Sequence, residues 1–139
     1  MPNRAARLKS IAFVATESAE AEESRARLVA RYGEASTDQA DVVVALGGDG
    51  LMLMMLHRLM NSGKAIYGMN RGTVGFLMNE YREDDLVDRL EKAVVSTIHP
   101  LEMTAVGADG RQRKAHAINE DSLLLQSYQA AKLRISTDG

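Results

Sequence analysis

A short apolar, β-branched run at residues 41–46 leads directly into Gly-Gly-Asp-Gly at residues 47–50. A run of this length and composition is typical of a buried strand. Residues 51–60 follow at once and are unbranched and rich in helix formers, so they predict a helix. The chain is therefore expected to pass from strand to helix through three glycines and one carboxylate.

The glycines of this turn indicate a close approach of the backbone to a ligand. Gly47, Gly48 and Gly50 have no Cβ, and the start of the next helix offers unpaired N–H groups that suit a phosphate. Asp49 would repel a phosphate, so its carboxylate indicates a hydroxyl group to be activated or a metal. The pattern suggests phosphoryl transfer to an alcohol. The alternative is a plain tight turn in which Asp49 caps the helix, and the tetrapeptide alone leaves both open.

The flanking segments predict an α/β fold built on a parallel sheet. Strands are expected at residues 11–15, 41–46 and 65–69, and helices at residues 16–32, 51–60 and 79–95. Short connections between alternating strands and helices imply right-handed crossovers and parallel strands. Ligands bind such sheets at the carboxyl ends of the strands, so the turn at 47–50 and the loop at 70–75 are expected at one edge.

A second glycine-rich stretch covers residues 68–77, with the sequence Gly-Met-Asn-Arg-Gly-Thr-Val-Gly-Phe-Leu. Its three glycines again indicate a backbone held close to a neighbour. Phe76 either packs in the core or forms the wall of a purine or nicotinamide pocket, and the sequence leaves both open. We interpret Arg71 as a surface residue, although its side chain could reach a phosphate.

The pattern changes in the last third of the chain. Residues 101–108 and 113–118 predict two strands joined by an Asp-Gly hairpin turn, and further short strands are expected beyond them. We therefore assign residues 1–98 to a Rossmann-like α/β domain and residues 99–139 to the start of an all-β domain. So few strands cannot close their own core, so we expect this domain to be incomplete, either in a longer protein or beside a partner.

Composition narrows the possible partners. The chain has 139 residues, a formal net charge of −2, no cysteine and 4% aromatic residues. This balance gives no support for nucleic-acid or membrane binding, and the lack of cysteine excludes disulfides and thiolate metal sites. No apolar run is long enough for a signal peptide or a membrane span, so we expect a cytoplasmic protein.

Three segments together resemble the NAD kinase family: Gly-Gly-Asp-Gly at 47–50, the loop at 68–77, and Ala-Ile-Asn-Glu at 117–120. The first is shared with diacylglycerol and sphingosine kinases, whereas the other two make the match specific. The resemblance implies an α/β domain followed by a β-rich domain of the β-sandwich type, with the active site between them. It also implies phosphate transfer from ATP, or from polyphosphate, to the 2′-hydroxyl of the adenosine ribose of NAD. A divalent cation such as Mg²⁺ and a dimer or tetramer are implied as well.

By this resemblance Asp49 is the catalytic proton acceptor and Gly50 lies beside the substrate. Gly47 and Gly48 belong to the loop nearest the phosphates. The chemistry agrees with the role of Asp49, because a ribose hydroxyl is a poor nucleophile that a carboxylate can orient and deprotonate. No residue is assigned as a metal ligand.

The resemblance places Phe76 on the adenine side of the pocket, and Asn119 and Glu120 against substrate hydroxyls and amides. Asparagine offers a donor and an acceptor, and glutamate accepts from two hydroxyls, so the pair matches a ribose diol. The alternative for this pair is a turn at a strand end with local backbone hydrogen bonds.

Two departures from the family pattern affect what we expect of this chain. Leu51 stands where the family commonly has threonine, and the second family signature, a Thr-Gly-Ser-Thr-Ala-Tyr type segment, is absent. We therefore expect the 139-residue chain alone to be an inactive fragment. The alternatives are a lipid kinase of the diacylglycerol kinase type and a nucleotide-binding module without turnover.

Overall fold

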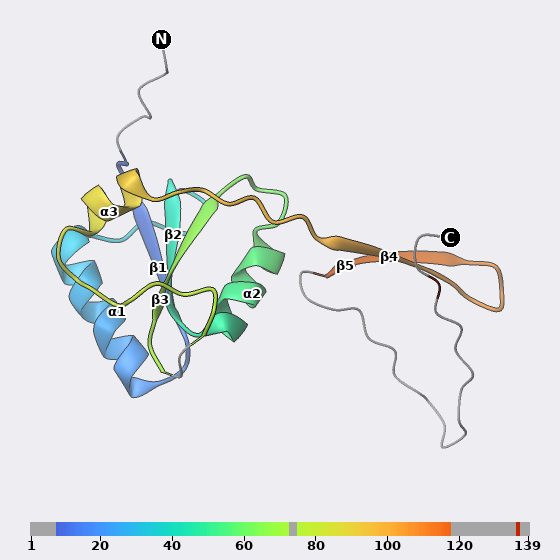
Figure 1. Cartoon of the computed structure of the whole chain (residues 1–139), viewed down its shortest axis with the longest axis horizontal. Helices are drawn as coiled ribbons and strands as arrows, with labels where there is room; N and C mark the ends of the chain where they lie inside the picture. The colour runs from blue at the N-terminus through green and yellow to red at the C-terminus, as the bar shows by residue number, and fades with distance from the viewer. Residues whose placement is uncertain (1–7, 73–74, 118–135, 137–139) are drawn as a thin grey trace, which may run out of the picture.

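The computed structural model describes residues 8–72, 75–117 and 136. Six elements form an α/β unit and two more form a hairpin (Figure 1). In chain order they are β1 (Ile11–Ala15), α1 (Ala19–Tyr32), β2 (Val42–Gly47), α2 (Asp49–Arg58), β3 (Ala65–Asn70), α3 (Leu86–Lys92), β4 (Leu101–Val106) and β5 (Gln112–Ala117). The α/β class and the antiparallel strand pair expected after it are both confirmed.

β2 is the central strand of a parallel sheet with the order β1-β2-β3. Every residue of β2 is buried. Its β-branched apolar sequence suits this position, because both faces of a central parallel strand are covered. The three predicted strands agree with the observed bounds to within one residue at each end.

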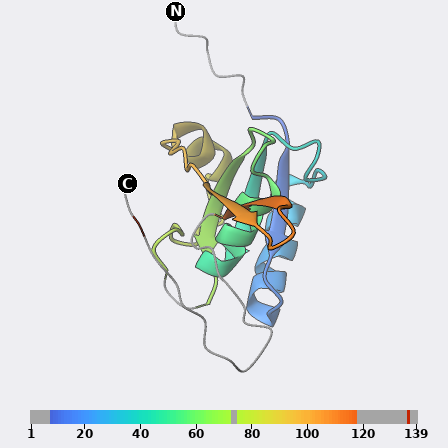
Figure 2. The same cartoon turned by 90° about the vertical axis from the view of Figure 1, so that its right-hand side faces the viewer.

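α1 and α2 cover opposite faces of this sheet (Figures 1 and 2). Leu28 of α1 belongs to the same core cluster as Val44, whereas Met55 of α2 belongs to the cluster that contains Val43. Neighbouring residues of a strand point to opposite faces, so the two helices lie on different sides. The strands follow one another across the sheet, but the two connecting helices lie on opposite faces. The β1-α1-β2 and β2-α2-β3 crossovers therefore have opposite hands. The expectation that both are right-handed is wrong.

The third helix differs most from its prediction, because α3 is much shorter than residues 79–95. The N–H of Asn79 donates to the carbonyl oxygen of Gly68, and the N–H of Asn70 donates to the carbonyl oxygen of Asn79, both at 2.8 Å. The backbone at this point therefore continues the hydrogen bonding of β3 instead of starting a helix. Asp85, with φ 53°, lies in the left-handed region immediately before α3.

The hairpin of β4 and β5 extends away from the α/β unit (Figure 1). Gly110 has φ 80° in the connection, which confirms the predicted Asp-Gly turn. Nε2 of His57 in α2 lies 3.1 Å from the carbonyl oxygen of His116 in β5 and links the two parts. The domain boundary between residues 98 and 99 stays a prediction. Across the described ranges, no helix has both the length and the apolar character that a membrane span requires.

Candidate active site

The two glycine-rich segments meet at the carboxyl ends of β2 and β3, as the sequence predicts. Gly47 pairs with Asn70 in the sheet, and the N–H of Arg71 donates to the carbonyl oxygen of Gly47 at 2.8 Å. This hydrogen bond carries the pairing of β2 and β3 one residue beyond the end of β3. The turn at 47–50 and the loop after β3 therefore lie side by side.

Asp49 is the first residue of α2, and its carboxylate reaches across to the second loop. Oδ2 accepts the N–H of Phe76 at 2.8 Å, and Oδ1 accepts the N–H of Leu77 at 2.9 Å. The cap of α2 is Gly48, which makes no side-chain hydrogen bond, so the alternative in which Asp49 caps its own helix is wrong. Each carboxylate oxygen has two lone pairs, so each keeps one for a further donor such as a hydroxyl group.

The glycines of the first turn differ in how much space surrounds them. A Cβ on Gly47 would lie 3.0 Å from Cδ2 of Leu51 and 3.2 Å from Cβ of Thr16, so packing disfavours a side chain there. Apart from its chain neighbours and, for Gly50, the backbone of α2, no described atom lies within 4 Å of a Cβ placed on Gly48 or Gly50, and neither has a positive φ. Neither protein packing in the described ranges nor backbone strain explains these two glycines. The space beside the turn at these two positions is open.

Leu51, which stands where the family commonly has threonine, packs beneath the turn. Its side chain lies against the core cluster of Ala12, Ala40, Val43 and Met55, between α2 and the sheet. An apolar residue suits this position because it adds to the contact between the helix and the strands. The side chain therefore serves packing under the site.

Arg71 is more buried than the surface residue we expected, with 21% of its side chain exposed. Its guanidinium carbon lies 3.4 Å from the ring centroid of Tyr81, and Nη1 lies 2.9 Å from Oε1 of Glu20 in α1. Oδ1 of Asn70 and Nε of Arg71 are buried without a hydrogen-bond partner among the described residues. An open pocket of about 420 Å³ lies here, lined by Asn70, Arg71, Gly75, Met78, Asn79, Glu80 and Tyr81.

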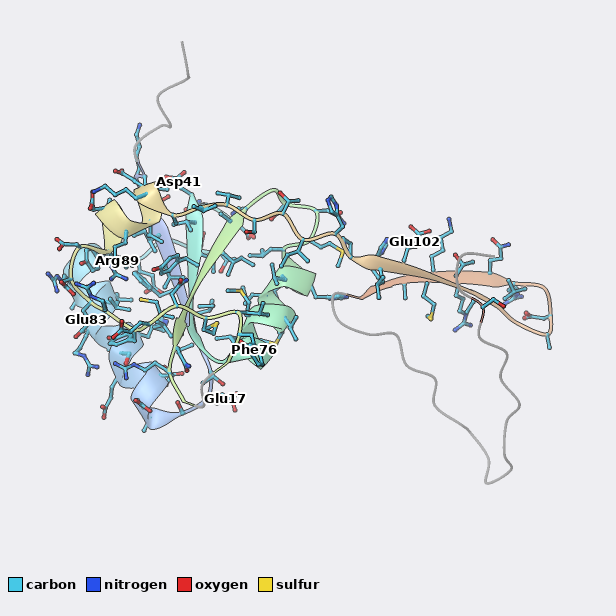
Figure 3. All side chains as sticks on the ribbon, viewed as in Figure 1. Glu17, Asp41, Phe76, Glu83, Arg89 and Glu102 are labelled. Carbon is cyan, nitrogen blue, oxygen red and sulfur yellow. The ribbon has the colours of Figure 1, made fainter. Side chains whose placement is uncertain are left out.

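Phe76 is fully exposed, with a relative accessibility of 101%, so the alternative in which it packs in the core is wrong. Figure 3 shows it beside the start of α2. Its role as a pocket wall stays a prediction. Asn119 and Glu120 lie outside the described residues, so their roles also stay predictions.

Comparison with known proteins decides the family. A family model described as the ATP-NAD kinase N-terminal domain matches residues 5–97. The chain belongs to the NAD kinase family. The resemblance drawn from the two glycine-rich segments and the Asn-Glu pair is thereby confirmed.

Several bacterial proteins named NAD kinase are similar to this chain. Those of Mesorhizobium japonicum and Caulobacter vibrioides are each 56% identical over 129 residues, which is 93% of this chain and 50% of each relative. That of Rhizobium meliloti is 51% identical over 135 residues, or 97% of this chain and 52% of the relative. The chain therefore spans about half the length of the curated relatives it matches.

Proposed function

We propose that the complete protein phosphorylates the 2′-hydroxyl of the adenosine ribose of NAD, with ATP or polyphosphate as the donor. The observation that carries this proposal is the Asp49 carboxylate, held between two glycine-rich loops at the carboxyl edge of the sheet. Space beside Gly48 and Gly50 is free of described atoms, so a nucleotide can approach the turn. Membership of the NAD kinase family supports the same reaction.

Asp49 would orient the ribose hydroxyl and accept its proton. The 2′-oxygen forms a bond to the terminal phosphorus of ATP as the bond from that phosphorus to the bridging oxygen breaks and ADP leaves. The proton moves to a carboxylate oxygen of Asp49 through the lone pair that the loop N–H groups leave free. Positioning and charge neutralisation supply the rest of the rate increase in such reactions.

We propose a divalent cation only as an ion that binds together with the substrate phosphates. Mg²⁺ is commonly held by one or two carboxylates together with substrate phosphates and water. The described residues do not bring together three His, Cys, Asp or Glu side chains that could hold a metal by themselves. A metal held by protein side chains alone therefore does not fit the described residues, and no step of the reaction is assigned to one.

The remaining roles follow the family pattern. Phe76 would line the adenine side of the pocket, and its exposed ring beside α2 is compatible with stacking on a base. Asn119 and Glu120 would hold the substrate hydroxyls and amides. The complete protein is proposed to act in the cytoplasm as a dimer or tetramer.

The test is NADP formation by the complete protein from NAD, ATP and magnesium, followed through an NADP-specific dehydrogenase. Appearance of NADP supports the proposal, and polyphosphate in place of ATP then identifies the accepted donors. Phosphorylation of diacylglycerol with no NADP formed would favour the lipid kinase alternative. Binding of NAD or ATP without product would favour a binding module.

A further inference from the structure

The Asp49 carboxylate lies directly against Cα of Gly75. A Cβ built on Gly75 would be 2.3 Å from Oδ1, 2.5 Å from Cγ and 2.7 Å from Oδ2 of Asp49. All three distances are shorter than real Cβ contacts reach, so any side chain at this position would displace the carboxylate.

The two residues after Gly75 complete a seat for the carboxylate, which we define as Cα of Gly75 with the N–H groups of Phe76 and Leu77. The N–H groups donate to different oxygens of Asp49, at 2.8 and 2.9 Å. Two hydrogen bonds to two oxygens fix the plane of the carboxylate as well as its position. The seat therefore determines where the remaining lone pairs point.

The seat is itself anchored to the sheet. The backbone of Asn79 exchanges hydrogen bonds with Gly68 and Asn70 of β3 at 2.8 Å. The side chain of Met78 lies against Gly68, where even a Cβ would be 2.4 Å from the sulfur. Asp49 is fixed from the other side as the first residue of α2. Asp49 is therefore held by α2, and the seat is tied to β3 by the isolated bridge between Met69 and Asn79.

We propose that Gly75 is a positioning residue for Asp49 in the phosphoryl transfer, which rests on the proposed function of Asp49. The missing side chain lets the carboxylate rest on the loop with one lone pair of each oxygen free for the ribose hydroxyl. Alanine at this position turns the carboxylate away from the N–H groups of Phe76 and Leu77. The proton acceptor is then misplaced, while no side chain proposed to bind the nucleotide is removed.

In the complete protein, Gly75→Ala is expected to lower kcat by about 100-fold, the cost of a misplacement of about 1 Å. KM for NAD should change little, because the variant removes no group that binds the substrate. Gly107→Ala is the matched control, since its Cβ would lie 2.8 Å from an oxygen of Asp109 in the hairpin turn, away from the site. This control should keep the kcat of the unmodified protein. An unchanged kcat in Gly75→Ala would overturn the proposal.

A stability cycle tests the contact separately from the reaction. The fall in Tm caused by Gly75→Ala is measured once in the unmodified protein and once in an Asp49→Ala background, where the clashing carboxylate is gone. A fall that is clearly smaller in the Asp49→Ala background supports the proposal, and so does a double variant that folds where Gly75→Ala alone does not. An equal fall in both backgrounds, or failure of both to fold, overturns it. If the unmodified protein forms no NADP, the proposed function fails. The stability cycle still tests whether Gly75 and the Asp49 carboxylate are in contact.

Discussion

Asp49 accepts two backbone hydrogen bonds through two different oxygens, and asparagine cannot accept both of them. Asparagine offers one acceptor oxygen and one NH₂ group. Its NH₂ group would therefore lie against the backbone N–H of either Phe76 or Leu77, and two donors would face each other. In the complete protein, Asp49→Asn is expected to lower kcat for NADP formation by roughly 10²–10⁴-fold. NAD affinity, measured by calorimetry, should change less than turnover.

A matched control for this substitution lies in the hairpin. Oδ1 of Asp109 accepts the N–H of Arg111 at 3.0 Å, far from the candidate site in sequence. Asp109→Asn should leave turnover unchanged. Near-normal turnover in Asp49→Asn itself would remove Asp49 from the role of proton acceptor.

The aromatic ring of Tyr81 lies against the guanidinium of Arg71 and makes the cation–π contact. Tyr81→Phe keeps an aromatic face over the cation, whereas Tyr81→Leu removes it. A cation–π contact at a partly exposed site contributes about 0.5–2 kcal/mol, so Tyr81→Leu should lower Tm more than Tyr81→Phe. Thermal unfolding of both variants checks this, and equal losses would mean that the stack contributes little.

At the level of the elements, the carboxylate of Asp41 joins the start of β2 to the residues before β1. It accepts the N–H of Lys9 at 2.8 Å and that of Ser10 at 3.2 Å. The hydrogen bond from Lys9 is the largest cause that lowers the pKa of Asp41 below its usual 3.8. A group with a lowered folded-state pKa stabilises the fold above its unfolded-state pKa, and this stabilisation is lost as the pH falls through the folded-state pKa.

Asp41→Asn is therefore expected to lower Tm at neutral pH, and the difference from the unmodified protein should shrink as the pH falls below the usual Asp pKa of 3.8. Asp38→Asn is a suitable control, because Asp38 is exposed in the preceding loop. Thermal unfolding followed by circular dichroism from neutral to acidic pH measures the effect. A difference that stays constant over this range would contradict it.

The sequence predicts individual elements well where one local signal dominates. The expected strand at residues 11–15 is apolar throughout and that at residues 41–46 is apolar after Asp41, and the structure confirms both to within one residue. The first helix begins at Ala19 and not at residue 16, because Ser18 takes the capping position and accepts the N–H of Ala21. The helix expected from residue 79 does not begin there, because the backbone of Asn79 pairs with β3, and this pairing depends on residues about ten positions away in the chain.

The candidate site could be predicted in its location and less well in its contacts. The glycine pattern indicates the shared edge of β2 and β3 and the importance of Asp49. It does not indicate that this carboxylate is held by N–H groups 27 and 28 residues later, because backbone donors have no sequence signature. The burial of Arg71 was missed for a similar reason, since its partners come from α1 and from the segment after β3.

At the level of the whole molecule, the chain spans about half of the relatives it matches, and the β4–β5 hairpin carries exposed apolar residues such as Leu101 and Val106. We predict that residues 1–139 alone have negligible NAD kinase activity, because the family's second signature is not among them. A mass-verified sample of this chain and the complete protein should be compared in the same NADP assay. Robust turnover by the 139-residue sample would contradict this prediction.

Only Gly48 separates the last residue of β2 from the first residue of α2. One inserted residue would rotate α2 by about 100° relative to its present start and carry Asp49 away from its seat. The chain length at this junction is therefore constrained as strictly as the residue types. Libraries that vary loop length should leave this junction intact and place insertions in the connection between α1 and β2, whose residues are mostly exposed.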